Sequence, residues 1–295
     1  MKVLIYKSKI ILFIVVFVYF LLLSLYISRL LDKGNNKYEN SFNDKNSILK
    51  YIYKSLNFKK QLKNIQNLKK VVYTIILGNY DEPNSFIKQK GYDYYLITDT
   101  DNDTIYKTTN WKTLKIPDSV HILPVSTVKK QRFLKLHPHL LFKNYDLSIY
   151  IDGEFKIKGN LDEFLLRTLN SNSYLYSFEH PARNNIIDEI QEVIRLKREK
   201  KSMGELLYQR YKKEKFPDDK GLIESCLLIR KHNNKSCINI MKKWFEEIRK
   251  YSHRDQLSFN YIYWKNIIKI KYLSKQLFFQ YFNQPKPHLI NKAYE

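Results

Sequence analysis

The sequence predicts an α/β fold, with a mostly parallel central sheet flanked by helices and one N-terminal transmembrane helix before it. Three observations support this prediction: a long uncharged segment near the N-terminus, short β-rich runs that alternate with helical segments, and carboxylates placed where those runs end. Hydrophobic residues make up 44% of the chain and aromatic residues 15%, which excludes a disordered main body. Two cysteines are too few for a disulfide-stapled mini-protein or a zinc cluster of four thiolates.

Residues 10–28 are expected to form the membrane anchor. The run IILFIVVFVYFLLLSLYI has no charge, and as a helix it would reach roughly 27 Å, close to the thickness of a bilayer core. A cleaved signal peptide is the alternative, but its apolar region would be shorter and no small-x-small site follows before Arg29. Three lysines in the tail of residues 1–9 favour a cytoplasmic N-terminus. We therefore expect a single-pass, type II membrane protein, in the Golgi or another secretory membrane if the chain is eukaryotic or host-expressed.

Residues 29–69 are rich in Lys, Asn and Ser and are expected to be a stem, with Ile48, Ile52, Leu56 and Leu62 spaced as on one amphipathic helix. The folded domain is expected over residues 70–295. Its predicted elements are strands at 71–78, 147–155 and 173–178, a strand that runs into an acidic loop over 93–103, a helix at 129–142, and a further β-rich run from 226. Ligands of such sheets bind where the strands end. Neither a Walker lysine loop nor GxGxxG is present.

The charge balance alone would suggest nucleic acid as a partner. Lys and Arg number 52 against 29 Asp and Glu, a formal net charge of +23. Only two alanines occur, however, while Lys, Asn, Ile and Tyr abound, which is the usage expected of an AT-rich genome. The basic residues are then spread over the surface, so no nucleic-acid function is expected, although a weak attraction to anionic membranes or substrates is compatible with them.

Asp152 and Glu154 flank Gly153 at the end of an apolar run. Two carboxylates in this position can both turn toward a hard divalent cation, Mn²⁺ or Mg²⁺, that also takes diphosphate oxygens. The alternative is a turn with solvated carboxylates. Four basic residues on the preceding predicted helix could offset phosphate charge, or could be an ordinary basic helix face: Lys129, Lys130, Arg132 and Lys135.

His180 and Arg183 lie in one loop after the strand at 173–178. A guanidinium can hold a diphosphate or acceptor oxygen, and the imidazole of His180 can shuttle a proton because its ordinary pKa lies near neutral pH. A loop clamped for structural reasons is an equal alternative.

Several motifs follow one another in a fixed order over roughly residues 70 to 266: VVYTIILGNYD, DYYLITD, RFLKLHPHLLFKNYDLSIYIDGEF, FEHPAR, GLIESCLLIRKHN and RDQLSFNYIYWK. Together they resemble the glycosyltransferase-like family that includes the plant mucilage-related and turgor-regulation-defect proteins and many bacterial relatives. The resemblance implies a GT-A type fold that binds a nucleotide sugar, and it does not fix which sugar.

By this resemblance Asp152 and Glu154 are similar to the Asp-x-Asp motif of GT-A enzymes, with the longer Glu in the second position. The same resemblance places four residues around the nucleotide, with the last at the base or ribose side: Tyr73, Thr74, Gly78 and Asp99. Packing in a core and capping of a loop are the alternative roles of these four.

The resemblance also makes Asp255 the strongest candidate for an acceptor-facing carboxylate, which would take the acceptor proton as the diphosphate departs. Capping of the helix that follows Asp255 is the alternative, and both roles are compatible. Trp244 and Trp264 are expected in the core more often than as platforms for a sugar ring. Cys226 and Cys237 are expected to be buried free thiols, with a disulfide as the alternative in an oxidising lumen.

The sequence thus predicts a membrane-anchored glycosyltransferase. Its partners would be a nucleotide-sugar donor, a glycan, glycoprotein or glycolipid acceptor, and the membrane, with a divalent cation as cofactor. The alternative of a different class is a catalytically inactive protein on the same fold that binds a sugar nucleotide or a polyanion.

Overall fold

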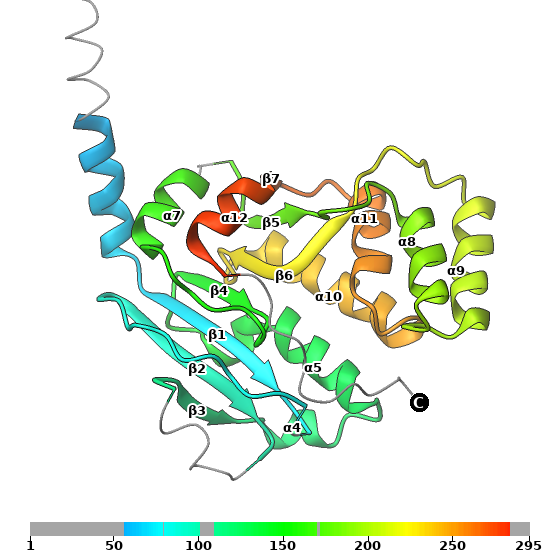
Figure 1. Cartoon of the computed structure of the whole chain (residues 1–295), viewed down its shortest axis with the longest axis horizontal. Coiled ribbons are helices and arrows are strands. Elements are labelled where there is room, and N and C mark those ends of the chain that lie inside the picture. The colour runs from blue at the N-terminus through cyan, green and yellow to red at the C-terminus, as the bar shows by residue number, and fades with distance from the viewer. Residues whose placement is uncertain (1–55, 79, 101–108, 170–171, 284–295) are drawn as a thin grey trace, which may run out of the picture. The chain divides into compact units, whose positions relative to one another are not determined.

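The computed structural model describes residues 56–78, 80–100, 109–169 and 172–283 (Figure 1). The chain divides into two compact units, residues 1–60 and 61–295, and the second unit holds the sheet. The predicted tail, membrane anchor and most of the stem lie outside the described residues. Within the described part of the chain, no helix is both long enough and apolar enough to cross a membrane. Residues 56–67, at the end of the predicted stem, are helical.

One seven-stranded sheet forms the centre of the second unit, in the order β3-β2-β1-β4-β6-β5-β7. The strands are β1 (Lys70–Ile76), β2 (Tyr92–Thr98), β3 (Lys112–Lys115), β4 (Leu147–Ile151), β5 (Leu175–Glu179), β6 (Ile223–Arg230) and β7 (Ile270–Leu273). Strand β6 runs antiparallel to its neighbours β4 and β5, and the other pairs are parallel. The prediction of an α/β fold with a mostly parallel sheet is confirmed.

Two hydrophobic layers cover the two faces of this sheet. Successive residues of a strand point to opposite faces, so Tyr73 and Tyr150 join one cluster while Val72 and Ile149 join the other. The first layer contains α4 (Asp118–His121), α5 (Thr127–Leu136), α6 (Pro138–Leu141), α8 (Ile186–Arg195), α9 (Lys201–Lys213), α10 (Lys235–Lys250) and α11 (Gln256–Lys265). The second contains α7 (Leu161–Thr168) and α12 (Lys275–Tyr281).

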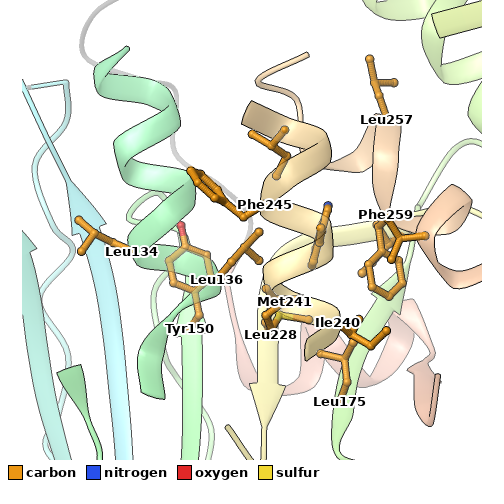
Figure 2. Close-up of a cluster of buried hydrophobic side chains, with 14 of the residues drawn as sticks. Leu134, Leu136, Tyr150, Leu175, Leu228, Ile240, Met241, Phe245, Leu257 and Phe259 are labelled. Carbon is orange, nitrogen blue, oxygen red and sulfur yellow. The ribbon is translucent and has the colours of Figure 1, made fainter. Parts of the chain in front are cut away.

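Helices α5 and α10 pack side by side in the first layer. Figure 2 shows Leu134 and Leu136 of α5 and Met241 and Phe245 of α10 in one cluster above the strands. Such burial of branched and aromatic side chains supplies most of the stability of a helix that would be marginal in isolation. Trp244 belongs to this core, with no exposed surface. The expected core role of Trp244 is therefore confirmed.

Polar residues at the helix starts explain where the helices begin. A side-chain oxygen accepts a backbone N–H of the first turn in α5, α7, α8, α10 and α12, and this replaces a hydrogen bond that the helix itself cannot make. The capping residues are Ser126, Asn160, Asn185, Asn234 and Ser274.

Several predicted boundaries differ from the observed ones. The strand predicted at 147–155 ends at Ile151, because the polar residues that follow turn out of the sheet. Strand β2 ends at Thr98, where the acidic residues expected to form a loop begin. The helix predicted at 129–142 is two helices, α5 and α6, which meet at His137. The residue before a proline is disfavoured in helical conformation, and Pro138 therefore ends α5. Strands β3 and β7 were not predicted, since neither has a buried apolar run.

The two cysteines lie in different layers. Cys226 in β6 and Cys237 in α10 are both free and buried, as expected. Burial raises the pKa of the Cys237 thiol to about 12, so it stays protonated at neutral pH.

One edge of the sheet collects most of the polar residues singled out in the sequence. The carboxyl ends of β1, β2, β4 and β5 lie there, because these strands run in the same direction. Strand β6 runs the other way, so its amino end lies at the same edge. We call this the ligand edge, following the general rule for such sheets.

Candidate functional site

Asp152 stands at the ligand edge directly after β4. Its backbone N–H donates to the Cys226 carbonyl at 2.9 Å, which continues the pairing of β4 with β6. The hydroxyl of Tyr150 donates to one carboxylate oxygen of Asp152, and Gln131 of α5 donates to that hydroxyl at 2.9 Å. One carboxylate oxygen of the half-buried Asp152 is therefore held in place.

The loop after Asp152 passes close to the end of β1. A Cβ at Gly153 would lie 3.1 Å from Cδ1 of Ile76, so a larger residue would crowd the Ile76 side chain. The Gly153 carbonyl accepts a hydrogen bond of 2.9 Å from the Asn84 amide. These contacts fix the direction in which Glu154, also half-buried, leaves the sheet.

A divalent cation fits this pair of carboxylates only in part. Carboxylate oxygens are the ligands that Mg²⁺ and Mn²⁺ prefer. Among the residues that the structure describes, no group of three or more His, Cys, Asp and Glu side chains is arranged to hold a metal. Asp152 and Glu154 would therefore supply at most part of the coordination shell, and water and phosphate oxygens would have to complete it.

Asp255 lies deeper and is paired with two cations. Its carboxylate is 2.5 Å from Nζ of Lys135 and 3.6 Å from Nε of Arg132, and only 6% of its side-chain surface is exposed. Burial by itself would raise the pKa of Asp255, but the charges of Arg132 and Lys135 outweigh it and hold the pKa below its usual value. The side chain also accepts the N–H of Gln256 and so caps α11, which was the alternative role.

Lys135 and Arg132 are the two cations that face Asp255, and they differ in how far they are buried. The Lys135 side chain is 1% exposed, lies 3.3 Å from the Ser225 hydroxyl and sits over the ring of Tyr150. The structure thus makes Lys135 an internal partner of Asp255 instead of a surface cation that could reach a diphosphate. Arg132 is more open, at 19% exposure, and its contact with a donor stays a prediction.

His180 and Arg183 take different roles within their loop. Nδ1 of His180 accepts the N–H groups of Ala182 and Arg183, so the ring proton is on Nε2. Arg183 donates to the buried Glu189 of α8, which is the clamp considered as an alternative from the sequence.

Nε2 of His180 lies between two carboxylates, 3.8 Å from Glu189 and 3.9 Å from Glu224. Burial lowers the pKa of His180, while Glu189 raises it by a smaller amount. The imidazole is then neutral at neutral pH and presents an N–H toward both acids.

Glu224 is the residue of this site that sequence reasoning missed. It is the second residue of β6, and its carboxylate lies 3.3 Å from the Gln256 amide. Burial first, and then the negative charge of Asp152, raise the pKa of Glu224 to about 7. An acidic residue inside the otherwise apolar run IESCLLIR was the available signal.

Arg254 was named in the sequence only as part of a motif. Its guanidinium donates to Gln256 at 3.4 Å, and its charge lowers the pKa of His180. In the described ranges, no carboxylate lies within ion-pair distance of Arg254, and its buried Nε makes no hydrogen bond. A guanidinium with unused donors, which acts on His180 and shares the contact with Gln256 that Glu224 also makes, can hold an anion at the ligand edge.

The four residues expected around a nucleotide differ in burial and in their hydrogen-bond partners. Tyr73 is fully buried and donates to the Lys135 carbonyl at 2.8 Å, so its side chain belongs to the core. Thr74 is buried with a hydroxyl that has no partner in the described part of the chain. Gly78 has φ +65° and donates its N–H to the exposed Asp99 at 2.9 Å. Gly78 and Asp99 therefore form the loop that was their alternative role, at the ligand edge.

An open α/β sheet that gathers acidic and basic side chains at its ligand edge has the architecture of proteins that bind ligands there. The family model of the TOD1/MUCI70 glycosyltransferase-like domain matches residues 56–286, and the chain belongs to this family. The resemblance seen in the sequence motifs is thus confirmed. No curated protein sequence matches the chain.

The fold is also similar to solved glycosyltransferase structures. For the apo structure of the bifunctional glycosyltransferase WbbM, the TM-score is 0.46 and the identity 13%, over 70% of this chain and only 39% of that one. For apo mouse xyloside xylosyltransferase 1 the values are 0.43 and 10%, over 69% and 85%. For the galactosyltransferase LgtC, solved with donor and acceptor sugar analogs, they are 0.39 and 10%, over 64% and 69%.

The buried pair of Lys135 and Asp255 predicts a large loss of stability when one partner is removed. We expect Asp255→Ala to lower the free energy of unfolding by about 3–5 kcal/mol, because it leaves a buried ammonium uncompensated. The double variant Lys135→Met, Asp255→Leu should lose much less than the two single variants together. Urea denaturation followed by circular dichroism measures both.

The matched control is the exposed pair of Lys201 and Glu205 on α9, 3.7 Å apart. Glu205→Ala should change stability by about 0.5 kcal/mol or less. An Asp255→Ala variant as stable as Glu205→Ala would contradict the burial argument.

The raised pKa of Glu224 predicts a pH-dependent difference between wild type and Glu224→Gln. Between the ordinary value of 4.5 and about 7, the folded protein keeps a proton that the unfolded chain has released, so stability falls as pH rises through this window. The variant does not titrate here. Its melting temperature relative to wild type should therefore rise from about pH 5 to about pH 8, measured by calorimetry with EDTA present.

Glu246 of α10 is the control, because its pKa is shifted in the opposite direction. The hydrogen bond with Arg249 lowers the pKa of Glu246, so the melting temperature of Glu246→Gln relative to wild type should not rise over the same window. A Glu224→Gln difference that stays flat with pH would mean that the folded pKa of Glu224 is ordinary.

Proposed function

We propose that this protein is a membrane-anchored glycosyltransferase of GT-A type, which moves a sugar from a nucleotide donor to a glycan, glycoprotein or glycolipid acceptor. One observation carries the proposal: in a chain of a glycosyltransferase-like family, Asp152 and Glu154 leave β4 at the edge where Glu224, His180 and Arg254 also lie. The membrane part rests on the uncharged run at 10–28, which favours a single-pass, type II location in a secretory membrane if the host is eukaryotic.

Sugar transfer forms a bond between an acceptor hydroxyl oxygen and the anomeric carbon and breaks the bond from that carbon to the donor diphosphate. A divalent cation held by Asp152 and Glu154 would supply positive charge for the departing diphosphate. Arg254 and Arg132, the latter beside Asp255, would add hydrogen bonds to the diphosphate oxygens. The proton of the acceptor hydroxyl has to go to a nearby base.

Two carboxylates are candidates for this base. Asp255 is favoured by the family resemblance, but its charge is already shared with Lys135 and Arg132, and its lowered pKa makes it a weak proton acceptor. Glu224 is partly exposed, and its pKa of about 7 is close to working pH, where a general base is most effective. We therefore assign the proton to Glu224 and give Asp255 a positioning role.

The donor-binding loop is tested by Asp152→Asn, which keeps the size and removes the charge. Turnover of the donor should fall by a factor of about 100 or more while circular dichroism shows an intact fold, because the leaving diphosphate loses its compensating charge. Glu154→Gln should cost less if the longer arm binds through water. The assay is hydrolysis or transfer with a panel of nucleotide sugars and Mn²⁺.

Removal of the cation is the control for the same experiment. EDTA should abolish wild-type turnover and excess Mn²⁺ should restore it. Equal rates under both conditions would remove the metal from the mechanism and leave the arginines as the phosphate ligands. A protein that binds the donors but turns over none of them would be the inactive binder considered from the sequence.

The base is identified by comparing Glu224→Gln with Asp255→Asn. We expect Glu224→Gln to lower kcat by a factor of about 100 or more and to remove the fall in rate below about pH 7, with donor affinity unchanged. Asp255→Asn should lower kcat less, since Asp255 does not take the proton in this assignment and Asn still caps α11, although the variant should be less stable because Lys135 loses its counter-charge. Single-turnover kinetics and donor titrations separate the chemical step from binding, and the reverse order of effects would assign the proton to Asp255.

A further inference from the structure

A cavity of about 590 Å³ lies between the end of α11, strand β7 and the segment that leads into β6, and neither Asp152 nor Asp255 lines it. Three aromatic side chains contribute to its wall, together with residues before β6 and β7: Tyr263, Trp264, Tyr272, Asp219, Lys220, Gly221, Asn266, Ile267 and Ile268. The role of Trp264 was left open in the sequence, and the proposed reaction does not use this cavity.

Neighbouring aromatic rings fix the position of Trp264 in the cavity wall. The ring of Trp264 packs edge-on against Phe216, with ring centroids 5.5 Å apart, and lies 6.0 Å from the ring of Tyr261. Trp264 is only partly buried, and in the described part of the chain its indole N–H makes no hydrogen bond. A fixed aromatic surface with an unused donor suits a ligand that has both C–H groups and oxygens.

A buried amide orients the polar part of the wall. Asn260, with no exposed surface, donates to the Tyr272 hydroxyl at 3.0 Å and to the Lys220 carbonyl at 2.7 Å. Because the hydroxyl oxygen of Tyr272 accepts from Asn260, its own proton is available to a ligand. No other hydrogen bond of this hydroxyl occurs within the residues that the structure describes.

The charges at the cavity are paired. Its one lysine and its one aspartate, Lys220 and Asp219, pair with each other at 2.9 Å. Lys265, whose Nζ lies 5.7 Å from the centre of the Trp264 ring, pairs with Glu214. A phosphate or a nucleotide would find no unpaired cation in this wall, whereas a neutral ligand has no charge to desolvate.

The cavity is joined to the candidate site through the start of β6. Gly221 has φ +70° and turns the chain from the cavity wall into the strand. The next carbonyl, of Leu222, accepts the N–H of His180 at 2.8 Å, and the N–H of Ile223 donates to Asn260 at 2.9 Å. Glu224 follows directly.

We propose that this cavity binds a neutral saccharide unit of the acceptor, stacked on Trp264 and hydrogen-bonded to Tyr272. Apolar C–H faces of a sugar ring pack on aromatic rings, and its hydroxyl groups accept the protons that Tyr272 and Trp264 leave unused. The inference rests on the proposed function, since it names the substrate class of the acceptor side of the same edge.

The test is direct binding of the full chain to an array of neutral oligosaccharides built from glucose, galactose, mannose, xylose and N-acetylglucosamine. We expect at least one of them to bind, and Trp264→Ala to weaken that affinity about tenfold or more. Tyr272→Phe keeps the ring and should weaken it about threefold to tenfold. Tyr208→Phe, on α9 outside the cavity, is the matched control and should bind like wild type.

The thermal melting of Tyr272→Phe shows whether that variant is folded, so the result does not depend on Trp264→Ala alone. Binding of none of these glycans, or unchanged affinity in both cavity variants, overturns the proposal. Wild-type donor hydrolysis measured in parallel keeps the two proposals apart. Glycan binding that depends on Trp264, without donor turnover, would refute the transferase and support the saccharide site. Donor turnover with an acceptor KM unchanged in both variants would support the transferase and refute the saccharide site.

Discussion

The ion pair between Lys135 and Asp255 is the contact on which the arrangement of the ligand edge depends. It joins the end of α5 to the start of α11, and Lys135 also reaches Ser225 of β6 and the ring of Tyr150 in β4. A buried ammonium needs a compensating charge and satisfied hydrogen bonds, so these four elements can pack together only in the geometry that provides them. Arg132 then takes its position beside the same carboxylate.

The reversed direction of β6 determines which carboxylates meet. In a fully parallel sheet, the start of this strand would lie at the opposite edge from Asp152. Because β6 is antiparallel between β4 and β5, Glu224 instead lies between residues that follow each of them, Asp152 and His180. The proximity of Asp152 contributes to the raised pKa of Glu224, which is the property a proton acceptor near neutral pH needs.

The sequence was sufficient for the features that are local in the chain. Continuous apolar runs gave the buried strands, and the Asp152 to Glu154 loop could be placed at a strand end because polar residues directly follow such a run. The role of Glu224 could not be found in this way, because it depends on pairing with residues more than 40 positions away. The burial of Tyr73 could not be read locally either: its hydroxyl donates to the carbonyl of Lys135, 62 positions away, inside the core.

The start of β6 also separates two chemically different surfaces. On its β4 side lie Asp152 and Glu154, the proposed ligands of a cation, and on its other side Asn260 donates to Tyr272, which lines the aromatic cavity together with Trp264. Glu224 stands where the two meet. In the proposed reaction, a carboxylate in that position takes a proton from a hydroxyl presented by the neutral side while the charged side holds the leaving group, so one strand end would order both substrates.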